Sequence, residues 1–83
     1  MKTTPEVEFL APNQCIIYTE NGQFLQSYDS IIVKIQNGII TLDENKWDYS
    51  VTTGKYRNRF LCETKKETQK KIDSGEYKLS DLN

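Results

Sequence analysis

Apolar and polar residues alternate along much of the first half of the chain, and this period of two is typical of β-strands. Residues 14–28 hold two such runs around the Asn-Gly pair at 21–22, and residues 31–44 hold two more around the Asn-Gly pair at 37–38. Asn-Gly tolerates the positive φ values that a two-residue type I′ turn requires. Each segment is therefore predicted to be a β-hairpin, and together they predict an antiparallel meander of about four strands.

The second hairpin has the clearer pattern. When the strands are paired across 37–38, one face is uniformly apolar and carries Val33, Ile35, Ile40 and Leu42, with Ile31 extending it. That face is expected to be covered by the rest of the chain. The first hairpin, when paired across 21–22, places Tyr18 opposite Leu25 and has no purely apolar face. The pattern therefore leaves open which of its faces is buried.

After Trp47 the period of the apolar residues changes from two to 3.6, which predicts a helix from about Ser50 to Cys62. The side chain of Ser50 suits the N-cap position, where it can accept a hydrogen bond from a free backbone amide. One side of this helix is predicted to dock on the sheet through Thr53, Tyr56, Phe60 and Leu61, while the other side exposes Thr52, Lys55 and Arg59. Gly54 costs about 1 kcal/mol here relative to Ala. It either lets another group approach closely or indicates that the helix begins one turn later.

The end of the chain predicts a second short helix and an extended tail. Thr64 and Glu67 form a capping box, and Gly75 is well placed to stop the helix after about residue 73. The tail is expected to dock through Tyr77 and Leu79. At the other end, residues 1–13 are predicted to be a flexible arm or an edge strand, loose before Pro5. The predicted architecture is a single α+β domain of residues 1–83.

The composition describes a soluble globular domain: 36% of the 83 residues are hydrophobic and 28% are charged. No apolar run approaches the roughly 20 residues that a membrane span needs, and the N-terminus lacks a secretory pattern. The expected location is therefore the cytoplasm of a bacterial host. Cys15 and Cys62 are then expected to be reduced and to serve as small buried apolar residues.

The chain contains no histidine, which removes Ser-His-Asp and Cys-His catalysis and histidine zinc sites. The acidic group Asp43, Glu44 and Asp48 lacks the spacing of a calcium loop. No pattern therefore predicts a metal or a cofactor, and the protein is not expected to be an enzyme.

Positive charge is concentrated in residues 55–71, where five lysines and two arginines face two glutamates, for a net charge of +5. Such a surface could bind a nucleic acid or another partner. With a nucleic acid, the cations would neutralise phosphates and the aromatic rings would stack on bases. The residues predicted to form this site are Lys55, Arg57, Arg59, Lys65, Lys66, Lys70 and Lys71, with Trp47 and Tyr49. An ordinary solvated helical surface is the alternative.

The pattern W-D-Y-S-x-T-T-x-K-Y-x-x-x-F-L over residues 47–61, followed by K-K-E-T-x-K-K-I and G-E-Y-K-L, resembles a family of small uncharacterised proteins. These occur in bacteriophages and mobile elements of Gram-positive bacteria. The resemblance covers roughly the last two thirds of the chain and leaves out the residues before Gln14. It implies a phage or mobile-element origin, and it brings no activity, ligand or catalytic residue.

Two functional hypotheses follow. The first is a non-enzymatic protein that binds a host or phage protein, of the host-takeover or counter-defence type. The second is a nucleic-acid-binding accessory protein that uses the basic residues 55–71. Exposed sheet edges and Trp47 also leave room for a homodimer.

Overall fold

The structure is a computed structural model that describes residues 6–83. The predicted loose segment before residue 6 lies outside the described residues. The elements follow the order β1 (Glu6–Ala11), β2 (Gln14–Thr19), β3 (Gly22–Ser27), β4 (Ser30–Gln36), β5 (Ile39–Asp43), α1 (Val51–Leu61), α2 (Lys65–Asp73) and β6 (Lys78–Ser80). The predicted α+β class is confirmed. Neither described helix is long and apolar enough to cross a membrane.

The sheet has six strands where the pattern predicted about four. Strands β1 to β5 form an antiparallel meander, and β6 lies parallel to β5. Strand β1 takes an edge position, which tolerates the prolines that flank it. Strand β6 was missed because it has only three residues. Its parallel direction follows from the connection through α1 and α2, since parallel neighbours need a long crossover rather than a turn.

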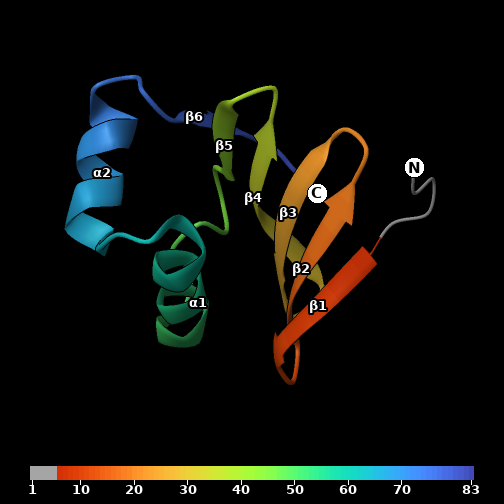
Figure 1. The fold of residues 1–83 in the computed structure, drawn as a ribbon. Helices are drawn as coiled ribbons and strands as arrows, with labels where there is room; N and C mark the ends of the chain where they lie inside the picture. Colours follow the sequence, from red (N-terminus) through yellow and green to blue (C-terminus); the bar gives the residue numbers. More distant parts are fainter. Residues whose placement is uncertain (1–5) are drawn as a thin grey trace.

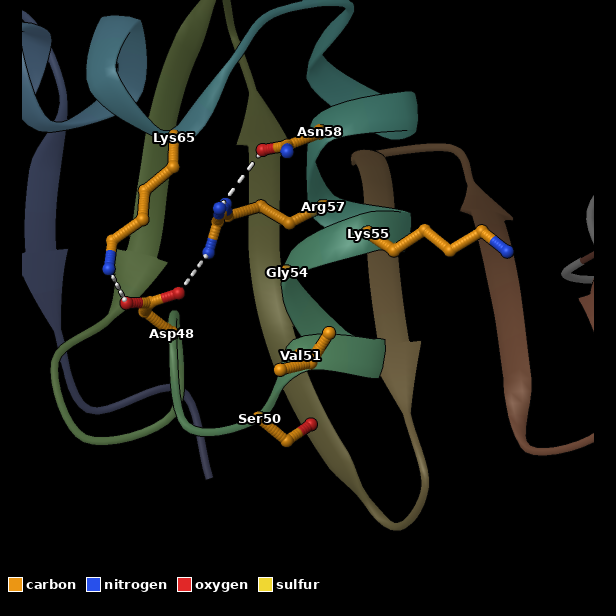
Figure 2. A pocket seen from close by; sticks show the side chains of 8 residues that line it. All are labelled: Asp48, Ser50, Val51, Gly54, Lys55, Arg57, Asn58 and Lys65. Carbon is orange, nitrogen blue, oxygen red and sulfur yellow. Dashed lines mark hydrogen bonds and ion pairs between the residues drawn. The ribbon is translucent and has the colours of Figure 1, made fainter.

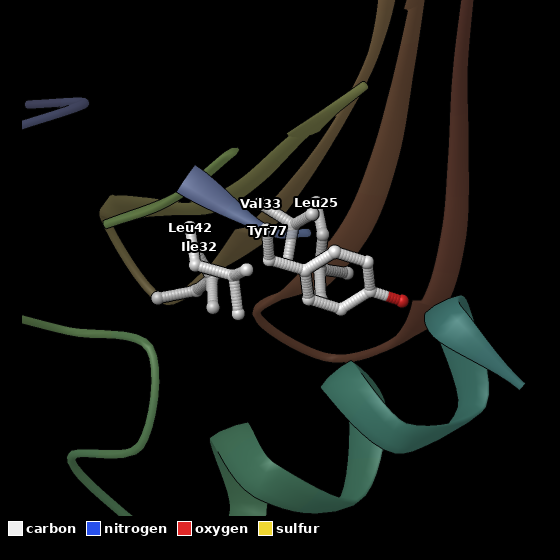
Figure 3. Packing of buried hydrophobic residues seen from close by; sticks show 5 residues of the cluster. All are labelled: Leu25, Ile32, Val33, Leu42 and Tyr77. Carbon is white, nitrogen blue, oxygen red and sulfur yellow. The ribbon is translucent and has the colours of Figure 1, made fainter. Parts of the chain in front are cut away.

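Both helices lie on the same side of the sheet (Figure 1). Between them and the strands is a small core of five buried side chains, drawn in Figure 3: Leu25, Ile32, Val33, Leu42 and Tyr77. Three of its members form a row across the sheet, because Leu25 pairs with Val33 and Val33 pairs with Leu42. Phe60 and Leu61 of α1 pack against this cluster, as predicted.

A β-bulge changes one predicted core residue. The second hairpin has the predicted register, with Val33 opposite Leu42 and Ile35 opposite Ile40. On its other side, however, the pairing of β4 with β3 shifts between Leu25 and Gln26, so that β4 carries one extra residue there. Such a bulge lets two successive side chains turn to the same face. Ile32 is therefore fully buried beside Val33, and the predicted core residue Ile31 is only partly buried.

The turn of the first hairpin lies one residue earlier than predicted, so Leu25 pairs with Ile16 rather than with Tyr18. Thr19 pairs with Gly22 and Ile16 with Leu25, so the turn consists of residues 20–21. The hydroxyl of Thr19 accepts hydrogen bonds from the backbone N–H groups of Asn21 and Gly22 at 3.2 and 3.1 Å, which stabilises this turn. Gly22 belongs to β3, where a Cβ atom would lie 2.1 Å from the carbonyl oxygen of Ile35. Glycine is therefore required at position 22 by the close approach of β4, and not by the turn.

Helix α1 begins at the predicted cap, but one position of its inner stripe differs from the prediction. The Oγ of Ser50 accepts a hydrogen bond from the N–H of Thr53 at 3.1 Å. Thr53 is buried, and its hydroxyl lies 2.8 Å from the hydroxyl of Ser27 on β3. The next fully buried side chain is Arg57, whereas Tyr56 is only partly buried. Lys55 and Arg59 are exposed, as predicted.

Helix α2 and the tail largely follow the prediction. The capping box of Thr64 and Glu67 is present, and Gly75 has the positive φ of 84° expected of a stop residue. Tyr77 is buried, but Leu79 is 45% exposed because β6 is itself an edge strand.

The two cysteines are free thiols, but only one of them is buried as predicted. Cys15 lies in β2 and is buried. Cys62 is exposed because it is the C-cap of α1, with a left-handed φ of 57°.

Two glycine substitutions test these contacts. Gly22→Ala is expected to lower the free energy of unfolding by about 3 kcal/mol, because the new methyl group overlaps the Ile35 carbonyl. Gly54→Ala is expected to raise it by about 0.5–1 kcal/mol, since its Cβ finds only ordinary contacts at 3.5 Å or more and the helix gains propensity. Urea unfolding followed by circular dichroism measures both. Equal effects of the two substitutions would contradict the close packing at Gly22.

Candidate functional site

The structure places Arg57, one of the predicted binding residues, inside the protein. Its side chain is 1% exposed. Its Nη1 donates to the carbonyl oxygen of Trp47 at 2.7 Å and to Oδ1 of Asp48 at 3.0 Å, and its Nη2 donates to Oδ1 of Asn58 at 2.9 Å. The guanidinium also lies 5.1 Å from the centre of the Trp47 ring. The expectation that Arg57 faces a ligand is therefore wrong: its charge is used to fix the loop that precedes α1.

Asp48 links this cluster to α2. Its second oxygen, Oδ2, lies 2.6 Å from Nζ of Lys65 at the start of α2. Figure 2 shows Arg57 and Lys65 reaching this carboxylate from opposite sides. Partial burial alone would raise the pKa of Asp48, but the hydrogen bonds from Lys65 and Arg57 outweigh it and hold the pKa below its usual value. Both oxygens thus have cationic partners, so Asp48 is poorly suited to act as a base or a metal ligand. Among residues 6–83, no group of acidic or thiol side chains could hold a metal ion.

A cleft of about 770 Å³ runs along α1 beside these residues. Its lining consists of Asp48, Ser50, Val51, Gly54, Lys55, Arg57, Asn58 and Lys65 (Figure 2). The sequence left open whether Gly54 lets another group approach or indicates a later start of the helix. The helix includes Gly54, and the groups near it are the guanidinium of Arg57 and the carboxylate of Asp48. Most polar groups of the cleft are therefore already bonded to each other.

The remaining predicted cations belong to two different helices. Lys55 and Arg59 project from α1, and Nζ of Lys55 lies 5.6 Å from the centre of the Tyr56 ring. Lys65 belongs to α2, and in Figure 2 its ammonium group reaches Asp48, while Lys55 extends in the opposite direction. Lys66 and Lys70 are exposed on α2. The structure thus divides the predicted basic site between two helices.

The two predicted aromatic members of the site differ in their surroundings. Trp47 packs against the core and the Arg57 guanidinium. Tyr49 is 43% exposed, and Nζ of Lys46 lies 5.1 Å from the centre of its ring. Of this pair, Tyr49 remains accessible to a partner.

Lys71 is held in a buried polar cluster that joins the end of α1 to α2 and the tail. Its Nζ lies 2.7 Å from Oε1 of Glu63, and the hydroxyl of Tyr77 donates to the same oxygen at 2.9 Å. Thr68 donates to the other carboxylate oxygen. Burial would raise the pKa of Glu63, but these hydrogen bonds, with that of Lys71 the strongest, lower it below its ordinary value. The hydrogen bond to Glu63 likewise raises the pKa of Lys71.

The face of the sheet opposite the helices carries a feature that the sequence analysis missed. Because Phe24 neighbours the buried Leu25 in β3, its side chain lies on the opposite face. Phe24 pairs with Ile17, and Ile17 pairs with Val7. Phe9, two residues after Val7 on the same face, is 76% exposed, and Val7 is 49% exposed. We call Val7, Phe9, Ile17 and Phe24 the open-face patch.

The signal for this patch was present in the alternation of residues 6–10, where apolar side chains follow glutamates. It could not be used, because neither face of the first hairpin is purely apolar and the sequence therefore left open which of its faces is buried.

The fold and these surfaces define a small α+β domain in which both helices lie on the same face of a mixed sheet. The chain belongs to a family of unknown function, DUF8033, whose model matches residues 3–76. The match includes β1, which the resemblance noted from residues 47–61 left out. No curated protein and no solved structure matches the chain.

The buried guanidinium provides a stability test. Arg57→Lys is expected to lower the free energy of unfolding by about 2–3 kcal/mol, since an ammonium group cannot reproduce the fork of hydrogen bonds and leaves buried acceptors unpaired. Arg59→Lys is the matched control, because Arg59 is exposed two residues further along the same helix. It is expected to change the stability by less than about 0.5 kcal/mol. Chemical denaturation of both variants measures the difference, and equal losses would contradict the role given to Arg57.

The pH dependence of stability tests the Glu63 cluster. A carboxylate whose pKa is lowered on folding stabilises the protein above its unfolded pKa of about 4.3 and loses that contribution as the pH falls through the folded value. Glu63→Gln is therefore expected to destabilise the protein clearly at pH 7 and much less at pH 3. Glu76→Gln, which alters an exposed glutamate near α2, is the control and is expected to have little effect at either pH. Urea titrations at the two pH values decide, and a pH-independent effect of Glu63→Gln would contradict this account.

Proposed function

We propose that this protein is a non-enzymatic binding protein of phage or mobile-element origin, which acts in the host cytoplasm by docking a host or phage protein on the open-face patch. The observation that carries the proposal is the exposure of Phe9 and Val7 on a sheet face that neither helix covers. Contiguous exposed apolar surface of this kind marks protein–protein contact sites in soluble proteins.

The patch has the composition expected of the centre of an interface. It combines two phenylalanines with two β-branched residues and contains no charge, whereas Lys34, the neighbour of Phe24 on β4, begins a polar rim. Charged residues are depleted and aromatic residues enriched at interface cores. An exposed aromatic ring such as Phe9 is the type of side chain that contributes most when it becomes buried.

The surfaces on the helix side support a protein partner less well. The Asp48 cluster is internally bonded, Lys65 is paired with Asp48, and the exposed cations belong to two different helices. A phosphate backbone is bound best by a continuous cationic track, so the division of these residues favours the apolar patch over the nucleic-acid hypothesis.

Affinity purification with matched variants tests the proposal. The bait is the tagged protein in a lysate of the bacterium that carries its gene, with recovery quantified by mass spectrometry. Phe9→Asp is expected to reduce recovery of the partner at least about tenfold, because it places a charge in the desolvated centre of the interface. Val51→Asp is the control, since Val51 is 92% exposed at the start of α1 on the opposite side of the sheet.

Both variants are expected to keep the stability of the wild type to within about 1 kcal/mol, as exposed positions usually do. A partner that is retained by Phe9→Asp, or lost with Val51→Asp, would contradict the patch as the docking surface. Failure to recover any partner with the wild type would contradict the proposed function itself.

A further inference from the structure

Strand β1 is an edge strand of the sheet, and its outer side could pair with a further strand. Its inner side pairs with β2, and no strand of residues 6–83 lies on its outer side. The other edge strand, β6, has only three residues and carries Lys78, and both features discourage pairing with a further strand. Strand β1 is twice as long, with six residues, and its first four side chains are exposed. The two edges of the sheet are therefore unequally protected.

The two faces of β1 differ in chemistry. Val7 and Phe9 lie on the open face, as part of the open-face patch. Glu8 lies on the helix face, where its Oε1 accepts a hydrogen bond of 2.8 Å from the hydroxyl of Tyr18. Its other oxygen, Oε2, accepts no hydrogen bond from residues 6–83. A strand that pairs with the free edge of β1 would therefore lie beside Val7 and Phe9 on the open face and beside Glu8 on the helix face.

A groove of about 290 Å³ lies beside β1 on the helix face. Leu10, Ile16 and Phe60 contribute its apolar walls, and Glu8 and Arg59 contribute opposite charges. Glu8 belongs to β1 itself, whereas Arg59 reaches this groove from α1, which contacts β3 and β4 on the inner side of β1. A strand added to β1 therefore meets the Glu8 carboxylate rather than the Arg59 guanidinium.

A second copy of this chain suits the edge poorly. In the antiparallel register that joins Val7 to Phe9 of the second copy, the two Glu8 carboxylates stand directly opposite each other, and like charges in that position destabilise a sheet. A register centred on Phe9 separates the glutamates. It runs instead into the irregularity between Phe9 and Ala11, which interrupts regular pairing. Charge and register both disfavour self-association through this edge.

We propose that β1 accepts an extended strand from the partner protein, with a basic side chain opposite Glu8 and apolar side chains opposite Val7 and Phe9. This inference rests on the proposed function and names the class of partner: a protein with an exposed segment that alternates apolar and basic residues. Backbone hydrogen bonds along the edge supply affinity in this mode of recognition, and the alternating side chains supply specificity. The apolar side chains of the added strand extend the open-face patch, and its basic side chain neutralises Glu8.

A synthetic peptide with acetylated and amidated ends, SVKFKVS, is the probe, and SVEFEVS is its charge-reversed control. The wild-type protein is expected to bind the lysine peptide at least about fivefold more tightly than the glutamate peptide, as measured by NMR titration. The backbone amides of β1 are expected to exchange more slowly with solvent in the complex. A lysine peptide N-methylated at alternate residues is expected to lose binding, because it cannot pair along the strand.

Charge-reversing variants complete the test. Glu8→Lys is expected to reverse the preference between the two peptides. Glu20→Lys, which makes the same charge change in the exposed turn between β2 and β3, is expected to preserve it. Equal binding of both peptides, no binding at millimolar concentration, or slowed exchange confined to α1 or α2 would overturn the proposal. So would a dimer that forms through β1 and excludes the peptide.

The outcomes also separate this inference from the proposed function. If Phe9→Asp abolishes recovery of the cellular partner while neither peptide binds β1, the partner docks on the open face without adding a strand. The proposed function then stands and the strand inference falls. If Phe9→Asp has no effect on recovery and neither peptide binds, both fall.

Discussion

The guanidinium of Arg57 joins the loop before α1 to α1 itself. It donates hydrogen bonds to the carbonyl oxygen of Trp47, the carboxylate of Asp48 and the side-chain oxygen of Asn58. These bonds fix the loop before α1 against the helix that follows. Through Asp48, the same network reaches Lys65 at the start of α2. A buried cation is tolerated only where its hydrogen bonds and charge are largely satisfied, so loop, helix and second helix are positioned together. The Glu63 cluster completes the arrangement by tying the end of α1 to Lys71 and Tyr77.

This arrangement has a consequence for function. With both helices on one face, no helix of residues 6–83 covers the opposite face, and the C-terminal residues Leu82 and Asn83 bond to Asp43 and Ile31, away from β1 and β2. The opposite face therefore keeps Val7 and Phe9 in solvent, beside an edge strand with an acidic side chain on its covered face. Of the cations and aromatic rings that first suggest a functional site, Arg57, Lys71 and Trp47 are used in building the fold. The surface proposed to bind a partner lies on the part of the sheet that neither helix covers.

How far the sequence alone predicted this structure depended on how local each interaction is. The caps at Ser50 and Thr64, the Asn-Gly turn at 37–38 and the register beside it were predicted because each is decided within a few residues. The turn of the first hairpin was predicted one residue too late, which places each pairing two positions from the observed one. There the glycine at 22 is required by a carbonyl on β4, a contact that only the assembled sheet creates. The bulge that buries Ile32 in place of Ile31 is likewise a property of the pairing between two strands. Arg57 was assigned to the surface because charge usually indicates exposure, and its acceptors include a backbone carbonyl that carries no sequence signal.

The central claim is that the uncovered face of the sheet, and not the outer side of the helices, is the working surface of the protein. Hydroxyl-radical footprinting of the protein before and after partner capture tests it most directly, because aromatic side chains on both sides report exposure in one experiment. We predict that Phe9 and Phe24 become protected from labelling in the complex, while Tyr49 and Tyr56 keep the labelling of the free protein. Protection of Tyr49 and Tyr56, with Phe9 unchanged, would contradict the account.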